Sequence, residues 1–380
     1  MKKLIAAPCI LAIILSTVLS GCFISSSTLK LGAILPMEGD ALTSGNSAKN
    51  GIELAIDQYN NSGKPIKKIE FTYYNGADNT PKSQSATKNL IADNKADVII
   101  GGLNSASALG IAPVVANNSK LIFISPTASS PAITNAGSNI FMAMPSEIFQ
   151  GEVIAKFASK DLKMTKVAIM INTDDKTGFE IADKFKATFL AAGGTISQAY
   201  GYKSTDTDFN QLLIEVGKTS PDAIFIADFD VIRVSTLITQ AFTLGLKTKY
   251  LSTDTIEDAI RNVDPKCYDD VYYPSLYSTV DSRIELQDFI RNYQTKYDAL
   301  PDLYAAYSYD TANLLIDTIN VAGGLNDTTA ILKLLSSNKF KGVTGEFKFD
   351  SERHASKQLL IFRIKEGKPH LFTSFDPENK

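Results

Sequence analysis

Residues 96–131 read ADVIIGGLNSASALGIAPVVANNSKLIFISPTASSP, and this stretch decides the fold. Two short apolar runs, Val98–Ile100 and Leu121–Ile124, flank a segment of helical character, Ser107–Asn117. Apolar runs without polar alternation are typical of strands that are buried on both faces of a parallel sheet. Two strands joined through a helix by short connections predict one unit of a doubly wound α/β sheet.

The same alternation continues on both sides of this stretch. A second series of helices and strands begins after Pro145, so we expect fold class α/β with two doubly wound parallel-sheet lobes and a ligand cleft at the carboxyl ends of their strands. The predicted strands are Leu29–Leu35, Ile69–Tyr74, Val98–Ile100, Leu121–Ile124, Val167–Ile171, Thr195–Tyr202, Ala223–Ala227, Lys249–Leu251, Gly345–Phe349 and Leu359–Ile364. The predicted helices are Ser47–Asn61, Pro81–Asn94, Ser107–Asn117, Ile148–Lys160, Gly178–Ala192, Phe209–Lys218, a stripe at Val234–Ala241, Ile284–Tyr297, Ala306–Val321 and Thr329–Ser336.

Composition excludes several functions. The chain has 380 residues, of which 44% are hydrophobic and 21% charged, as expected of two globular domains. Removing Lys2 and Lys3 with a leader leaves 36 of the 38 basic residues against 41 acidic ones, so nucleic acid is not an expected partner. The two histidines, His354 and His370, lack the spacing of a helical zinc site, and the sequence contains no glycine-rich nucleotide loop or serine-hydrolase elbow. We expect no metal, no cofactor and no enzymatic activity.

The N-terminus predicts export. A basic start is followed by an uncharged run, Leu4–Leu19, which is too short to span a bilayer, and then by Ser20-Gly21-Cys22. This end resembles the site at which bacterial lipoproteins are cleaved and acylated, so we expect a signal peptide at 1–21, a palmitate-type lipid anchor on Cys22 and a linker at 22–28. The alternative is a plain secretory leader with an incidental cysteine. Cys267 then has no partner, and no disulfide is expected.

Two turns rich in small and hydroxyl-bearing residues follow adjacent strands. Gly101–Ser107 comes after Val98–Ile100, and Ser125–Pro131 comes after Leu121–Ile124. Backbone N–H groups in such turns, with hydroxyls beside them, form a receptor for a carboxylate. The alternative is that these residues only cap helices and form turns.

Acidic residues follow two strands of the second lobe. Asp228 and Asp230 come directly after Ala223–Ala227, and Asp254 follows Lys249–Leu251 by three residues. A carboxylate that faces the cleft pairs with an ammonium group, strongly where both are withdrawn from water. The alternative for each acid is a helix N-cap or a solvated charge.

The element order and several motifs resemble those of a known family. Leu35-Pro36, Gly101-Gly102, Ile124-Ser125-Pro126 and Gly245-Leu246-Lys247-Thr248 look like their counterparts in type I periplasmic solute-binding proteins of ABC transporters, in the leucine/isoleucine/valine-binding branch. The resemblance runs from about Leu29 to about Phe372. We expect a three-segment hinge near Pro145, Leu276 and Phe349, with lobe 1 at 29–146 and 277–348 and lobe 2 at 147–276 and 349–380.

The resemblance also implies a binding site. In the family, a serine after the third strand and the turn after the fourth strand hold the ligand's α-carboxylate. These positions correspond to Ser105 and to Thr127, Ala128 and Ser129. An acid of the second lobe meets the α-ammonium group, and it corresponds to Asp254.

Other positions depart from the family pattern. Thr177 and Phe229 stand where tyrosines that contact the ammonium group are usual, and Asp228, Tyr304 and Tyr307 are candidates to replace those contacts. Asp78 and Asn104 stand where some relatives have a disulfide.

Together these features predict a monomeric, membrane-anchored extracytoplasmic protein. It captures a small ligand, an amino acid or a related carboxylate, between its lobes and delivers it to the permease subunits of an ABC transporter. The alternative is an envelope sensor or interaction protein with the same fold and no transported ligand.

Overall fold

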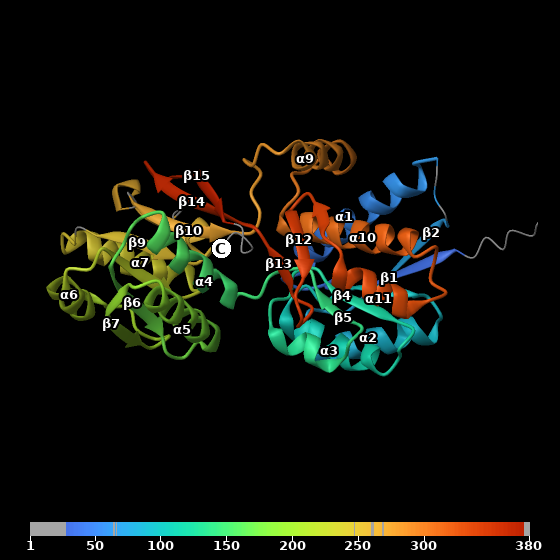
Figure 1. The fold of residues 1–380 in the computed structure, drawn as a ribbon, viewed down its shortest axis with the longest axis horizontal. Coiled ribbons are helices and arrows are strands. Elements are labelled where there is room, and N and C mark those ends of the chain that lie inside the picture. Colours follow the sequence, from blue (N-terminus) through green and yellow to red (C-terminus); the bar gives the residue numbers. More distant parts are fainter. Residues whose placement is uncertain are drawn as a thin grey trace, which may run out of the picture.

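The computed structural model describes residues 28–375 with the exception of 64, 66, 247, 260–261 and 268–269. The predicted signal peptide, Cys22 and most of the predicted linker lie outside the described residues. The described chain forms two α/β lobes that lie side by side along the long axis of the molecule, which confirms the predicted fold class (Figure 1). Among the described residues, no helix combines the length and the apolar character that a bilayer crossing needs.

Lobe 1 is built on a five-stranded parallel sheet with the order β2-β1-β3-β4-β5. Helices α2 (Thr80–Ala92) and α3 (Ser105–Ala116) cover one face, and α1 (Leu42–Asn60), α10 (Leu303–Val321) and α11 (Thr328–Ser337) cover the other. The strands are β1 (Leu29–Leu35), β2 (Ile69–Asn75), β3 (Val98–Gly101), β4 (Ile122–Ser125) and β5 (Ile140–Met142), with a 3₁₀ helix, η1 (Pro131–Ala136), before β5.

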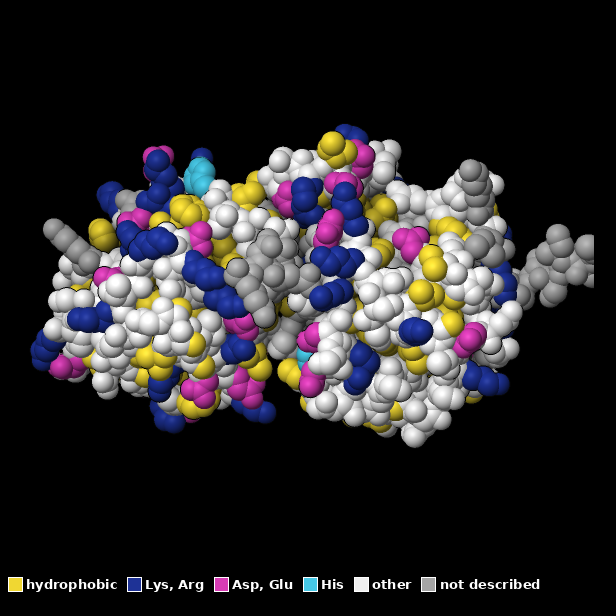
Figure 2. Space-filling model, viewed as in Figure 1, with side chains coloured by type: hydrophobic (Ala, Val, Ile, Leu, Met, Phe, Trp, Pro, Cys, Tyr) yellow, Lys and Arg dark blue, Asp and Glu magenta, His cyan; other side chains and the backbone are white. Residues whose placement is uncertain are grey.

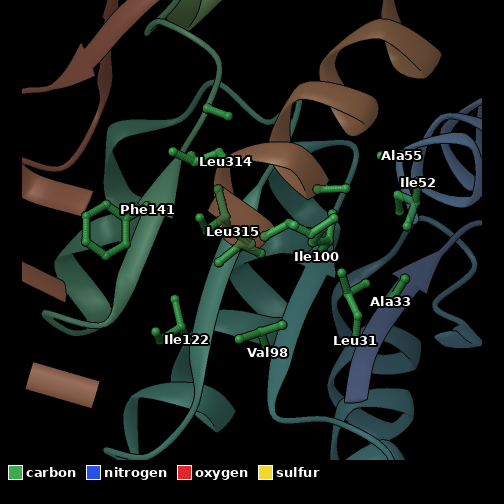
Figure 3. Packing of buried hydrophobic residues seen from close by; sticks show 14 of the residues in the cluster. Leu31, Ala33, Ile52, Ala55, Val98, Ile100, Ile122, Phe141, Leu314 and Leu315 are labelled. Carbon is green, nitrogen blue, oxygen red and sulfur yellow. The ribbon is translucent and has the colours of Figure 1, made fainter. Parts of the chain in front are cut away.

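The two-sided cover explains the apolar runs in the sequence. Leu31 and Ala33 of β1 belong to the cluster that includes residues of α1 and α10, whereas Ile34 belongs to the cluster on the α2 and α3 side. Figure 3 shows Leu31 and Ala33 in the cluster with Leu314 and Leu315 of α10. Because both faces of the strand are withdrawn from water, an apolar side chain is favoured at every position.

Lobe 2 is built on a seven-stranded sheet with the order β15-β14-β10-β9-β8-β6-β7. Helices α4 (Ile148–Lys160) and α5 (Lys176–Ala191) cover one face, and α6 (Asn210–Thr219) and α7 (Val231–Thr243) cover the other. The strands are β6 (Lys166–Asn172), β7 (Thr195–Tyr202), β8 (Ala223–Ala227), β9 (Lys249–Ser252), β10 (Val271–Ser275), β14 (Leu359–Lys365) and β15 (Lys368–Phe375), and the short helices α8 (Ile256–Ala259) and η3 (Pro265–Cys267) follow β9.

The structure differs from the sequence-based prediction in several elements. The second sheet is not parallel throughout, because the hairpin β14-β15 joins its edge antiparallel to β10. Helix α3 begins at Ser105 rather than at Ser107, since the Asn104 side chain caps it by accepting a hydrogen bond from the Ser107 N–H (2.8 Å). The strands that the sequence pattern does not reveal are β5, β10, β15 and two strands of a small antiparallel sheet, β11 (Phe340–Gly342) and β13 (Ala355–Lys357).

Three segments join the lobes. The first, residues 143–147, connects β5 to α4, and the second, residues 276–283, connects β10 to α9 (Ile284–Tyr297). Before the third segment, β13 pairs with β12 (Gly345–Phe349), and residues of both strands belong to a core cluster of lobe 1. We therefore place the third crossing at Gln358, between β13 and β14, rather than near Phe349.

Candidate functional site

The turn after β3 brings two backbone segments unusually close together. Gly101 and Gly102 have φ angles of 144° and 63°, and a Cβ on Gly101 would lie 2.1 Å from the Ile34 carbonyl oxygen. Only glycine fits there without a shift of the neighbouring backbone. The turn delivers the chain to Ser105, the first residue of α3.

Hydrogen bonds lock this turn to the turn after β4. The Ser125 hydroxyl donates to the Gly102 carbonyl (2.8 Å), and the Thr127 hydroxyl donates to the Leu103 carbonyl (2.7 Å). The Ser130 N–H donates to the Ser105 hydroxyl (3.3 Å). The structure thus brings together the sequence-predicted residues Ser105, Thr127, Ala128 and Ser129 at the carboxyl ends of adjacent strands.

The backbone N–H groups of Thr127 and Ser129 in this turn do not donate a hydrogen bond to any acceptor in the described part of the chain. Thr127 and Ser129 are each 7% exposed. Backbone N–H groups that have no acceptor within the protein are available to a carboxylate.

Asp254 belongs to lobe 2. It follows β9, and its backbone N–H donates to the Gln150 side-chain oxygen on α4 (3.2 Å). The pKa of the Asp254 carboxyl is raised to about 6, chiefly by burial; a hydrogen bond with Gln150 opposes the rise, and the charges of Glu147 and Glu257 contribute to it. A desolvated carboxyl with acidic neighbours is stabilised by an incoming cation.

Glu147 is a candidate site residue that the sequence pattern does not reveal. It lies in the first crossing segment, directly before α4. Burial raises the pKa of its carboxyl, the Ser129 hydroxyl lowers it by hydrogen bonding, and Asp175 raises it through charge repulsion. Ser129 of lobe 1 and Asp175 of lobe 2 therefore both affect the pKa of Glu147. An acid two residues after Pro145 was visible in the sequence, but its position depends on the path of the crossing.

The other residues considered for contact with the ligand, Thr177, Phe229 and Tyr304, lie in different parts of the structure. Thr177 lies in the first turn of α5, where its N–H donates to Asp175 Oδ1 (2.9 Å), so it is adjacent to an acid that acts on Glu147. Phe229 is half-buried and packs against the core of lobe 2. Tyr304 belongs to lobe 1, where it is partly buried and packs against the core.

The side chains of Asp228 and Tyr307 are buried and form hydrogen bonds within the protein. The Arg233 guanidinium donates to both Asp228 oxygens (2.8 and 2.9 Å), and the Tyr202 hydroxyl donates to Oδ2 (2.8 Å). Asp228 is fully buried, so the expectation that it replaces an ammonium contact is wrong. Tyr307 is also fully buried, and its hydroxyl donates to the Leu276 carbonyl (3.4 Å), which makes it a core residue at the second crossing.

The remaining predicted positions have local roles. Asp230 caps α7 by accepting from the Arg233 N–H (2.8 Å). Asn104 donates to the Asp78 carbonyl (3.2 Å), so a hydrogen bond joins the two turns that carry these residues. Cys267 is buried and unpaired. In the described residues, no group of three or more His, Cys, Asp and Glu side chains is arranged to hold a metal ion.

The molecule is indented between its lobes, as Figure 2 shows on the side where α3 and α5 face each other in Figure 1. Two sheets that present the carboxyl ends of their parallel strands, with a hinge of three segments between them, define the class of bilobal binding proteins.

Comparisons with known proteins agree with this class. The model of the periplasmic binding protein family matches residues 28–369, and the chain therefore belongs to this family. It is 27% identical over 208 residues to a Leu/Ile/Val-binding protein of Rhizobium johnstonii, a match that spans only about half of either chain (54% and 56%). It is 22% identical over 330 residues to a leucine-, isoleucine-, valine-, threonine- and alanine-binding protein of Pseudomonas aeruginosa, covering 86% of this chain and 87% of that one.

A solved structure shows the same fold. The solute-binding protein of an ABC transporter from Rhodopseudomonas palustris, in complex with 3,4-dihydroxybenzoic acid, superposes with a TM-score of 0.71 at 23% identity, covering 93% of this chain and 99% of that one. These findings confirm the resemblance to solute-binding proteins and the expectation of a binding protein rather than an enzyme. Membership of the family implies an extracytoplasmic location.

Proposed function

We propose that the protein is an extracytoplasmic solute-binding lipoprotein that captures an amino acid between its lobes and delivers it to an ABC permease. One observation carries the choice of ligand: N–H groups without acceptors on lobe 1 and a desolvated carboxyl, Asp254, on lobe 2 offer opposite poles to a zwitterion. Ser105, Thr127, Ala128 and Ser129 would hold the carboxylate, and Asp254 the ammonium group. Thr177, Phe229 and Tyr304 would contact the rest of the ligand.

Ligand binding closes the lobes in this proposal. A ligand shifts the equilibrium between open and closed forms only through its differential affinity for them. Because the two poles belong to different lobes, a zwitterion completes its contacts only in the closed form. The closed form is then the one that the permease recognises.

The remaining features follow the sequence. The predicted leader at 1–21 exports the chain, the lipid on Cys22 anchors it to a membrane, and the linker lets the monomeric lobes work in water.

A thermal-shift panel tests this function. Wild-type protein is heated with each common L-amino acid and with deaminated analogues such as 4-methylpentanoate. A ligand at 100 times its Kd adds about 2.7 kcal/mol of stability, which moves the melting temperature by several degrees. We expect at least one amino acid to do so and its deaminated analogue to do so less.

The envelope sensor or interaction protein is the second candidate, because a fold does not fix a function. It predicts no thermal response to any small solute. Such a result would contradict the proposed transport function.

A further inference from the structure

Lys357 is a buried lysine next to the third crossing. It is the last residue of β13, directly before Gln358, and only 1% of it is exposed. Its ammonium group donates a hydrogen bond to the Thr344 hydroxyl. The ammonium group also lies 4.3 Å from the centre of the Tyr307 ring and 4.7 Å from that of the Phe347 ring. Because an aromatic ring attracts a cation within about 6 Å of its centre, both rings help to hold the ammonium group in place.

Thr344 connects this ammonium group to a buried carboxylate. Asp310 of α10 is 1% exposed and accepts hydrogen bonds from the backbone N–H groups of Val343 and Thr344 (2.8 Å each) and from the Thr344 hydroxyl. The Thr344 hydroxyl therefore donates to Asp310 and accepts from Lys357. Since α10 belongs to lobe 1, these contacts fix the end of β13 to lobe 1 directly before the chain crosses.

The second crossing is attached to the same part of lobe 1. The Tyr307 hydroxyl donates to the Leu276 carbonyl (3.4 Å) at the start of this crossing. At its end, the Arg283 guanidinium donates to the carbonyl of Val343 (3.1 Å), the neighbour of Thr344. Residues of the second and third crossings also line one small cavity together, so the two crossings lie next to each other.

Stability alone does not explain a lysine at this position. Taking an ammonium group out of water is costly, and replacing a buried charge by an apolar side chain of similar size is often neutral or stabilising. Asp310 would keep three hydrogen-bond donors without Lys357. An ammonium group does provide directional contacts with Thr344 and with two ring faces, and these contacts fix the point at which β13 ends.

We propose that Lys357 is a positioning residue of the hinge and fixes the second and third crossings to lobe 1 as one unit. Lobe 2 then rotates about the far ends of these crossings, beside Ser275 and at Gln358, because Tyr307 and Lys357 hold the adjacent residues. A hinge whose bending is confined to a few residues limits lobe 2 to one path of closure. The proposal rests on the lobe closure of the proposed function, but not on the identity of the ligand.

Double electron–electron resonance on the unliganded protein measures how widely the lobes move. Spin labels are attached through a ketone-bearing amino acid introduced in place of Lys88 of α2 and Lys186 of α5, two exposed positions on different lobes, so the native cysteines stay unlabelled. Burial lowers the pKa of the Lys357 ammonium group to about 7, while the charge of Asp310 opposes this shift and that of Arg283 adds to it. Spectra are therefore recorded at pH 6, where most of these groups are protonated.

We expect one narrow distribution of interlobe distances in the wild type. Lys357→Met keeps the length of the side chain and removes its charge, and should widen the distribution about 1.5-fold or more. Tyr307→Phe removes only the hydroxyl that reaches Leu276 and should widen the distribution less. Lys348→Met removes an exposed lysine of the neighbouring strand β12 and is the matched control, with an unchanged width. A purely structural role of Lys357 would alter the melting temperature and leave the width unchanged.

Equal widths in wild-type and folded Lys357→Met protein would overturn the proposal. If Lys357→Met does not fold, Tyr307→Phe decides, since an unchanged width overturns the proposal and a wider distribution supports it. The thermal-shift panel tests the proposed function separately. A protein that binds no amino acid but shows the expected widths would contradict the proposed ligand and leave the role of Lys357 in place.

Discussion

The pKa of Asp254 makes affinity for an ammonium-bearing ligand depend on pH. Its carboxyl titrates at about 6 in the unliganded protein, because burial penalises the charged form. A group with this pKa is about 97% ionised at pH 7.5 and about 9% ionised at pH 5. Because the ionised form binds the ammonium group, acidification from pH 7.5 to 5 should weaken binding about tenfold, or by about 1.4 kcal/mol.

The same carboxyl affects the stability of the unliganded protein with the opposite sign. Its folded pKa lies above the usual value of about 3.9, so the folded protein holds this proton more tightly than the unfolded chain does. Its contribution to the free energy of unfolding therefore falls as the pH rises from about 4 to about 6. Protonation of Asp254 at low pH therefore stabilises the unliganded folded protein and weakens its affinity for the ligand.

Calorimetric titration of the tightest-binding amino acid at pH 5, 6 and 7.5 measures the first effect. Wild-type protein should lose affinity about tenfold at pH 5, and Asp254→Asn should lose clearly less over the same range. Glu147 also has a raised pKa and its charge acts on Asp254, so the difference between the two proteins reports Asp254 together with its coupling to Glu147. Asp174→Asn, which removes an exposed acid of lobe 2 paired with Lys203, is the matched control. Equal pH dependence in wild type and Asp254→Asn would refute the reasoning.

Three further predictions concern the scaffold and the anchor. Asp228→Asn should destabilise the fold by about 3–5 kcal/mol in urea unfolding, because Arg233 loses a buried partner, and a change below 1 kcal/mol would contradict that role. Gly101→Ala should cost more than about 1 kcal/mol and weaken ligand binding, since its φ of 144° and the nearby Ile34 oxygen exclude a Cβ; unchanged binding would separate this turn from the site. Cys22→Ser should move the protein from the membrane fraction to the soluble fraction of cells, and retention in membranes would show another anchor.

Local sequence pattern predicts much of this fold. The apolar runs of β1 and β8 have no polar alternation, and both strands are buried on both faces. Strands β5 and β10 were harder to predict, since β5 has only three residues and β10 contains Pro274. β13 is a strand because it pairs with β12, and its three residues alone do not predict this pairing.

Site residues that directly follow a strand could be predicted from the sequence. Residues whose role depends on tertiary contacts could not. The turn at Thr127–Ser129 and Asp254 follow strands in sequence, so their positions can be inferred from the order of elements. The structural role of Asp228 depends on Arg233, five residues along the chain, and on Tyr202, which lies 26 residues away. Glu147 enters the site because the first crossing places it between the lobes, and no local pattern encodes that path.

The central claim is that one ligand joins the two lobes through its carboxylate and its ammonium group. Affinities of wild-type and Asp254→Asn protein for an amino acid and for its deaminated analogue test it most directly, with L-leucine paired with 4-methylpentanoate and L-lysine with 6-aminohexanoate. The account predicts that Asp254→Asn weakens the amino acid at least tenfold and leaves the analogue within about twofold. Equal losses for both ligands would contradict the claim.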